Sequence, residues 1–149
     1  MSARLYLEDL FIGQRFRAGP VEVTAEAIKA FAAQFDPQPF HLDENAARDS
    51  LFGELVASGW HTAALTMRML TESAPFAGGV IGTGGRLEWP RPVRSGDRLA
   101  VESEILEIVP SRSRPDRGAV KIRTITSNQR GEAVQILTAR VIAFARPKP

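Results

Sequence analysis

Cysteine is absent from this chain, and histidine occurs only twice in its 149 residues. Without cysteine there can be no disulfide, no thiolate metal ligand and no cysteine nucleophile. Two histidines argue against a histidine-rich metal site. The Gly-x-Ser-x-Gly element of serine hydrolases is also missing, which disfavours that class of enzyme. Together these absences point away from metal and thiol chemistry.

Long apolar segments are absent as well. No run of 18 apolar residues occurs, so no membrane span is expected, and the first five residues lack the apolar core of a signal peptide. We therefore expect a cytoplasmic protein. The 44% hydrophobic content is ordinary for a soluble domain, and we interpret residues 1–149 as a single domain with a core of its own.

Charge is spread unevenly along the chain. The net charge is +2, but residues 1–85 hold six Lys/Arg and ten Asp/Glu, whereas residues 86–149 hold thirteen Lys/Arg and seven Asp/Glu. Such asymmetry indicates either an anionic partner or solvated basic surface. Only Trp89 and Phe144 are aromatic in the basic half. A nucleic-acid partner is therefore not expected, because base-stacking surfaces interleave basic and aromatic residues.

Helices are predicted in the first half of the chain. Residues 25–35 carry one apolar stripe at helical spacing and follow Thr24, a good N-cap. A short helix is expected over residues 43–50, with Asp43 as its cap. The longest helix, residues 58–73, is apolar over much of its surface, which is typical of a helix buried on nearly all sides.

The second half is rich in Val, Ile and Thr and partly alternates between apolar and polar residues. Four consecutive strands are predicted, after an extended lead-in over residues 5–23. A polar loop is expected over residues 110–117. Helices followed by consecutive strands predict an α+β fold in which an antiparallel sheet wraps around the long helix. The predicted strands are residues 80–89, 97–109, 118–128 and 132–144.

The stretch from Asp36 to Asp43 contains an aspartate and a histidine, Asp36 and His41, separated by two prolines. Each proline fixes its own φ and restricts the residue before it, so we predict a stiff, non-helical segment. Two titratable side chains on such a segment suit general acid–base catalysis of one reacting group. The alternative is purely structural: Asp36 ends one helix and His41 starts the next.

Ser58 and Gly59 open the long helix. Backbone N–H groups at a helix start are unpaired and carry partial positive charge, and glycine lets another group come close to the backbone. The Gly59 N–H is thus a candidate donor to an oxyanion. The alternative is plain helix capping by Ser58, and both can hold together. His61 in the same turn is interpreted as a packed or hydrogen-bonded histidine. The glycines at 82–85 are interpreted as a place where a strand crosses close to a helix, not as a phosphate loop.

These motifs together resemble the MaoC-like hydratase/dehydratase family. The likeness covers about residues 7–144, and its specific part is an Asp-x-Asn-Pro-apolar-His-x-acidic pattern. The chain departs from that pattern at Gln38, where asparagine is usual. The matching residues are Asp36, Pro39, Phe40, His41 and Asp43, followed by Phe52-Gly53 and Ala57-Ser58-Gly59-Trp60-His61.

The resemblance implies a hotdog fold, a homodimer or dimer of dimers, and hydration or dehydration of an acyl-CoA or acyl-carrier-protein thioester without a metal or redox cofactor. Asp36 and His41 would be the catalytic pair, and Gly59, Ser58 and Gln38 would bind the substrate. Two alternatives stay open: a hotdog acyl-CoA thioesterase and a non-catalytic acyl-CoA-binding module. Six arginines are candidates to contact the phosphates of CoA, namely Arg86, Arg91, Arg94, Arg112, Arg114 and Arg117.

Overall fold

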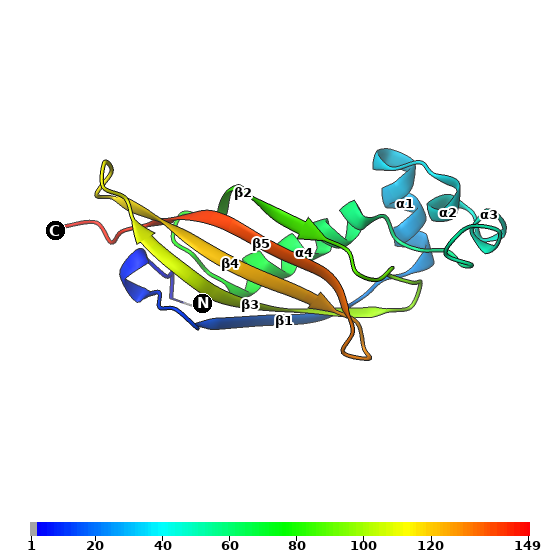
Figure 1. Ribbon diagram of the computed structural model, residues 1–149, viewed down its shortest axis with the longest axis horizontal. Coiled ribbons are helices and arrows are strands. Elements are labelled where there is room, and N and C mark those ends of the chain that lie inside the picture. The colour runs from blue at the N-terminus through cyan, green and yellow to red at the C-terminus, as the bar shows by residue number, and fades with distance from the viewer. Residues whose placement is uncertain (1–2) are drawn as a thin grey trace.

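Five strands form one antiparallel sheet in the computed structural model, which describes residues 3–149 (Figure 1). Their order across the sheet is β1-β3-β4-β5-β2. The prediction of an antiparallel α+β fold is confirmed. The strands are β1 (Arg15–Glu22), β2 (Ile81–Glu88), β3 (Arg98–Pro110), β4 (Arg117–Ser127) and β5 (Ala133–Phe144).

One long helix, α4 (Gly59–Ser73), lies along one face of the sheet, and three shorter helices gather beyond one end of it (Figure 1). The short helices are α1 (Ala25–Phe35), α2 (Pro39–Leu42) and α3 (Glu44–Arg48), and a 3₁₀ turn occupies Leu7–Asp9. Thr24 caps α1, since its hydroxyl accepts a hydrogen bond from the Ala27 N–H at 3.1 Å. Within the described residues, no helix is long and apolar enough to cross a membrane.

The structure adds two features to the four consecutive strands that were predicted. The extended lead-in contains a true strand, β1, which pairs with β3. In addition, β2 pairs with β5 and not with the next strand along the chain, so β2 lies at the opposite edge of the sheet from β1. Long-range pairing decides this order, and the sequence pattern of a strand does not say which strand is its neighbour.

The stretch between α1 and α3 is not wholly non-helical, contrary to the prediction. Asp36 and Gln38 do have non-helical backbone angles, but Pro39 begins the single turn of α2 that contains His41. Proline suits the first position of a helix because its φ is already near the helical value and that N–H has no partner within the helix. The second proline therefore starts a turn instead of preventing one.

Two apolar clusters form the core between α4 and the sheet. One contains Ile105 and Val120, and the other contains Met69 and Leu99. The prediction that α4 is buried on nearly all sides is wrong for the single chain, because Trp60 and Met67 are 59% and 43% exposed. One sheet covers only one side of a helix, so the opposite side of α4 stays open.

Candidate active site

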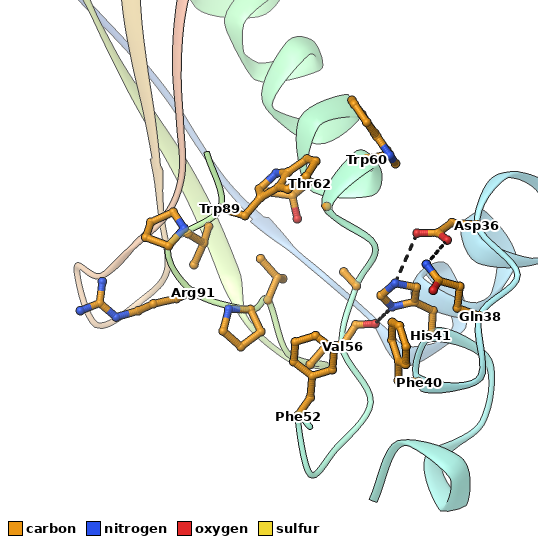
Figure 2. A pocket seen from close by; sticks show the side chains of 16 residues that line it. Asp36, Gln38, Phe40, His41, Phe52, Val56, Trp60, Thr62, Trp89 and Arg91 are labelled. Atoms are coloured by element: carbon orange, nitrogen blue, oxygen red, sulfur yellow. Dashed lines mark hydrogen bonds and ion pairs between the residues drawn. The ribbon is translucent and has the colours of Figure 1, made fainter. Parts of the chain in front are cut away.

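The end of α1 and the turn of α2 bring Asp36 and His41 together. Asp36 is the C-cap of α1, where its backbone N–H still donates to the Ala32 carbonyl at 2.9 Å. His41 lies on α2 and is only 5% exposed. The two side chains point toward each other in Figure 2, and His41 Nε2 lies 3.3 Å from Asp36 Oδ2. The sequence segment thus places a carboxylate and an imidazole within reach of one water molecule.

A hydrogen bond from the other ring nitrogen, Nδ1, fixes the orientation of the His41 ring. His41 Nδ1 lies 2.6 Å from the carbonyl oxygen of Val56 (Figure 2). Because a carbonyl can only accept, Nδ1 carries the proton and donates. In neutral His41 the lone pair is therefore on Nε2, the atom that faces Asp36. Protonation of Nε2 turns the same contact into an ion pair, so this nitrogen can both take up and release a proton at the site.

Asp36 accepts hydrogen bonds through both carboxylate oxygens. Ser58 Oγ donates to Oδ2 at 2.7 Å, and Gln38 Nε2 donates to Oδ1 at 2.5 Å. Partial burial raises the pKa of Asp36, but these two hydrogen bonds and the charge of His41 outweigh it and hold the pKa below its usual value. Asp36 is therefore ionised at neutral pH. Gln38, where the family pattern has asparagine, uses its amide to orient this carboxylate.

The first turn of α4 leaves one backbone donor at the site. Ser58 Oγ accepts from the Trp60 N–H at 3.2 Å, and the Ser58 carbonyl accepts from the N–H groups of His61 and Thr62 at 3.0 and 3.1 Å. No group within residues 3–149 accepts from the Gly59 N–H. This donor carries the partial positive charge of a helix start and is the one left available for an oxyanion. Ser58 is a cap and a partner of Asp36 at once.

A pocket of about 510 Å³ connects these groups. Asp36, His41 and Gly59 line it, and Arg91 lies across it from the Asp36–His41 pair (Figure 2). The rest of the lining is largely apolar and includes Phe40 and Phe52. An acidic residue, an imidazole, a free N–H and an apolar wall suit a neutral, partly apolar substrate whose carbonyl gains negative charge during the reaction.

The structure brings only one of the six candidate arginines, Arg91, into the lining of this pocket. Arg94 pairs with Glu54 at 3.2 Å, and Arg86 pairs with Glu88 at 2.5 Å. The remaining three lie in or next to the hairpin between β3 and β4, at the opposite end of the sheet from α1–α3 (Figure 1). Those three are Arg112, Arg114 and Arg117.

His61 is packed, as predicted, and takes no part in the pocket. It is 7% exposed and stacks on Phe31, with ring centroids 4.8 Å apart. Burial lowers the pKa of His61, because the charged form would lose its hydration. Within residues 3–149, no three His, Asp or Glu side chains come together as a metal site.

Three contributors to the site were not predicted from the sequence. Val56 acts through its backbone carbonyl, which no side-chain pattern reveals. Trp89 lines the pocket, and its indole N–H donates to the side-chain oxygen of Gln135 at 2.9 Å. Gln135 is the third contributor, and it is fully buried. Its one sign in the sequence is that it is a lone amide within the apolar start of β5.

Several known proteins are similar to this chain in sequence and in fold. The sequence matches the family described as MaoC like domain over residues 10–128. A 3-hydroxybutyryl-CoA dehydratase of Methylorubrum extorquens is 34% identical over 111 residues, which cover 74% of this chain and 69% of the relative. A solved MaoC-like dehydratase from Rhodospirillum rubrum is 60% identical, with a TM-score of 0.94 over 97% of this chain and 99% of that one. An unliganded (R)-hydratase from Pseudomonas aeruginosa is 30% identical, with a TM-score of 0.78 over 96% of this chain and 88% of that one.

Proposed function

The chain belongs to the MaoC-like domain family and has its hotdog fold, and on that premise we propose that it is a hydro-lyase acting on an acyl thioester. It adds water to a trans-2-enoyl thioester of coenzyme A or of acyl-carrier protein, or removes water in the reverse direction. The observation that carries the proposal is the 3.3 Å contact between His41 Nε2 and Asp36 Oδ2 at a pocket that also holds the free Gly59 N–H. The dehydratase and hydratase named among its relatives support the same reaction class.

The proposed reaction uses one water molecule that enters from the pocket and hydrogen-bonds to both Asp36 and His41 beside their 3.3 Å contact. The thioester carbonyl accepts a hydrogen bond from the Gly59 N–H, which stabilises the enolate-like charge that develops on its oxygen. His41 Nε2 takes a proton from the water, the water oxygen bonds to C3, and the C2–C3 π electrons move onto C2 and the carbonyl. His41 then returns the proton to C2, so no net proton is gained or lost. Ionised Asp36 orients the water and stabilises the imidazolium.

Incubation with a trans-2-enoyl-CoA tests this function. The conjugated enoyl absorbance should fall while no free thiol is released, because hydration leaves the thioester intact. Chiral analysis should give the (R)-3-hydroxyacyl product, as the name of the Pseudomonas relative suggests. Rapid thiol release from a saturated acyl-CoA would instead establish the thioesterase alternative. Tight binding of acyl-CoA without any turnover would identify the non-catalytic binding module.

Arg91 is proposed to bind a phosphate group of CoA. It lines the pocket and lies half exposed, and its two contacts, an ion pair with Glu132 and a hydrogen bond to the Ala133 carbonyl, are both long at 3.5 Å. Replacing Arg91 by Gln should raise KM for an enoyl-CoA several-fold with little change in kcat, since the phosphates lie far from the reacting carbons. The wild-type KM should rise with salt, because exposed charge pairs are screened.

The matched control for Arg91 is Arg17→Gln, which removes an exposed arginine of β1 that pairs with Glu102 away from the pocket. This variant should keep the wild-type KM. A KM for the CoA ester that stays flat with salt, and is the same in both variants, would show that Arg91 is ordinary surface charge.

A homodimer is proposed as the working assembly. The edge strand β2 is largely exposed, and open sheet edges are usually paired or covered. The open side of α4 also carries two exposed apolar side chains, Trp60 and Met67. Light scattering at micromolar protein should give about twice the mass of one chain. Met67→Lys should shift the protein toward monomer. Val109→Lys, which alters an apolar side chain of similar exposure on β3, should not, and a wild-type monomer would contradict the proposal.

A further inference from the structure

We infer that Trp89 and Gln135 hold the Gly59 peptide in place and thereby orient its N–H toward the substrate carbonyl. This inference rests on the proposed function, because it assigns two positioning residues to the proposed oxyanion donor. Neither residue touches the reacting atoms in this scheme. Both act through Gly59.

The indole of Trp89 packs directly on the backbone of Gly59. A Cβ atom added to Gly59 would lie 2.6 Å from Trp89 Cε2 and 2.7 Å from Cδ2 and Cζ2. Such distances are far inside van der Waals contact, so the ring occupies the space of the missing side chain. Gly59 has no side chain to anchor its own peptide, and glycine backbones are the least restricted of all. The contact with the ring supplies the restraint that the residue lacks.

Gln135 fixes the position of that ring. Trp89 Nε1 donates to Gln135 Oε1 at 2.9 Å, and Gln135 is completely buried on β5, opposite Thr126 of β4. An indole N–H can only donate, so the amide oxygen must face it. A second contact also restrains the ring of Trp89. The ring of Trp60 packs against it edge to face, with ring centroids 5.2 Å apart. A continuous path of contacts therefore runs from the rigid sheet through Gln135 and Trp89 to Gly59.

The buried amide leaves one of its own groups unpaired. Gln135 Nε2 has no hydrogen-bond partner within the described residues, and a buried unpaired donor opposes folding. An apolar residue of similar size, such as methionine, would avoid that penalty but could not hold the indole. The hydrogen bond that its oxygen accepts from Trp89 therefore explains this glutamine better than a contribution to folding stability does.

Orientation of the Gly59 N–H matters because an oxyanion donor acts only when it points at the oxygen in the transition state. Small displacements of groups around a reacting centre cause large losses of rate. Loosening the indole should therefore lower kcat more than it weakens substrate binding. The most informative change is Gln135→Met, because Gln135 does not line the pocket whereas Trp89 does.

The experiment compares Gln135→Met, Trp89→Phe and the double variant in hydration of an enoyl-CoA. Gln135→Met should lower kcat by about tenfold or more with KM nearly unchanged. Because both single changes remove the same hydrogen bond, the double variant should be scarcely slower than Trp89→Phe. The matched control is Thr124→Val, which removes a buried hydrogen bond with Ser103 at 2.9 Å elsewhere in the sheet and should keep the wild-type kcat.

A second readout separates positioning from stability. The thioester carbonyl stretch of bound butyryl-CoA, which has no double bond to hydrate, should shift to lower frequency in the wild type because the Gly59 N–H polarises the carbonyl. That shift should shrink in Gln135→Met and persist in Thr124→Val. An active wild type whose Gln135→Met variant keeps both its kcat and its carbonyl shift would overturn this inference alone. A wild type that neither hydrates enoyl-CoA nor binds butyryl-CoA would overturn the proposed function and this inference with it.

Discussion

Replacing Asp36 by Asn, or His41 by Ala, should each lower kcat for enoyl-CoA hydration by at least ~10²-fold, the lower end for a positioned acid or base. Asp36→Asn keeps the shape of the side chain but removes the negative charge that faces His41 Nε2 at 3.3 Å. His41→Ala removes the nitrogen whose lone pair is directed there by the Val56 carbonyl. Steady-state kinetics on purified variants, with thermal unfolding to confirm that each is folded, measure the effect.

The double variant is expected to be scarcely slower than either single variant. Both residues act on one water molecule in the proposed reaction, and the effects of groups that act as a unit are strongly non-additive. Multiplicative losses would instead mean that Asp36 and His41 serve separate steps. Near-normal turnover in both single variants would mean that the segment is only a structural connection.

Two neighbouring residues provide matched controls. Asp43→Asn changes another carboxylate of the same segment, which caps α3 by accepting from the Asn45 N–H at 2.8 Å. Asparagine caps helices about as well as aspartate, so its activity should stay near that of the wild type. His61→Phe changes the other histidine, which stacks on Phe31 outside the pocket, and it should also keep its turnover.

The parts of the site that are local in sequence were predictable. Asp36 and His41 are five positions apart, and proline chemistry restricts the backbone between them. Ser58 and Gly59 mark a helix start, and a helix start always has free N–H groups. In each case the residue types alone indicate the chemistry. What the sequence does not predict is that the two segments meet, through the 2.7 Å hydrogen bond from Ser58 to Asp36.

The parts that depend on strand pairing were not predictable. Gln135 reaches Trp89 because β2 pairs with β5, and no pattern in either strand specifies that pairing. The positions of the arginines in the fold were not predictable either. Their excess in residues 86–149 is plain from composition, yet composition does not say that Arg91 borders the pocket while Arg112 lies toward the far end of the sheet.

Replacing Gly59 by Ala should destabilise the protein and nearly abolish its activity. At most helix positions this change is favourable by about 0.4–1 kcal/mol, since alanine restricts the unfolded chain. The φ of Gly59 is not in the left-handed region, so the backbone itself would accept alanine. The obstacle is Trp89, whose ring atoms would lie 2.6–2.7 Å from the new Cβ. Overpacking of this kind typically costs ~1–3 kcal/mol.

The loss of activity should exceed what the loss of stability explains. Because Gln135 holds the indole at 2.9 Å, the strain should move the start of α4 and with it the Gly59 N–H. Displacing an oxyanion donor lowers kcat by ~10²–10³-fold, which is the expected range for Gly59→Ala at temperatures where the variant is fully folded. Thermal unfolding and steady-state kinetics measure the two effects separately.

Trp89→Leu supplies the control, because it makes room for the methyl group. In that background Gly59→Ala should cost much less stability than in the wild type, a coupling that is expected for residues in direct contact. Turnover should not recover in the double variant, since the ring that orients the Gly59 N–H is gone. A Gly59→Ala protein as stable and as active as the wild type would show that the indole yields freely, and that neither the contact with Trp89 nor the placement of this N–H governs catalysis.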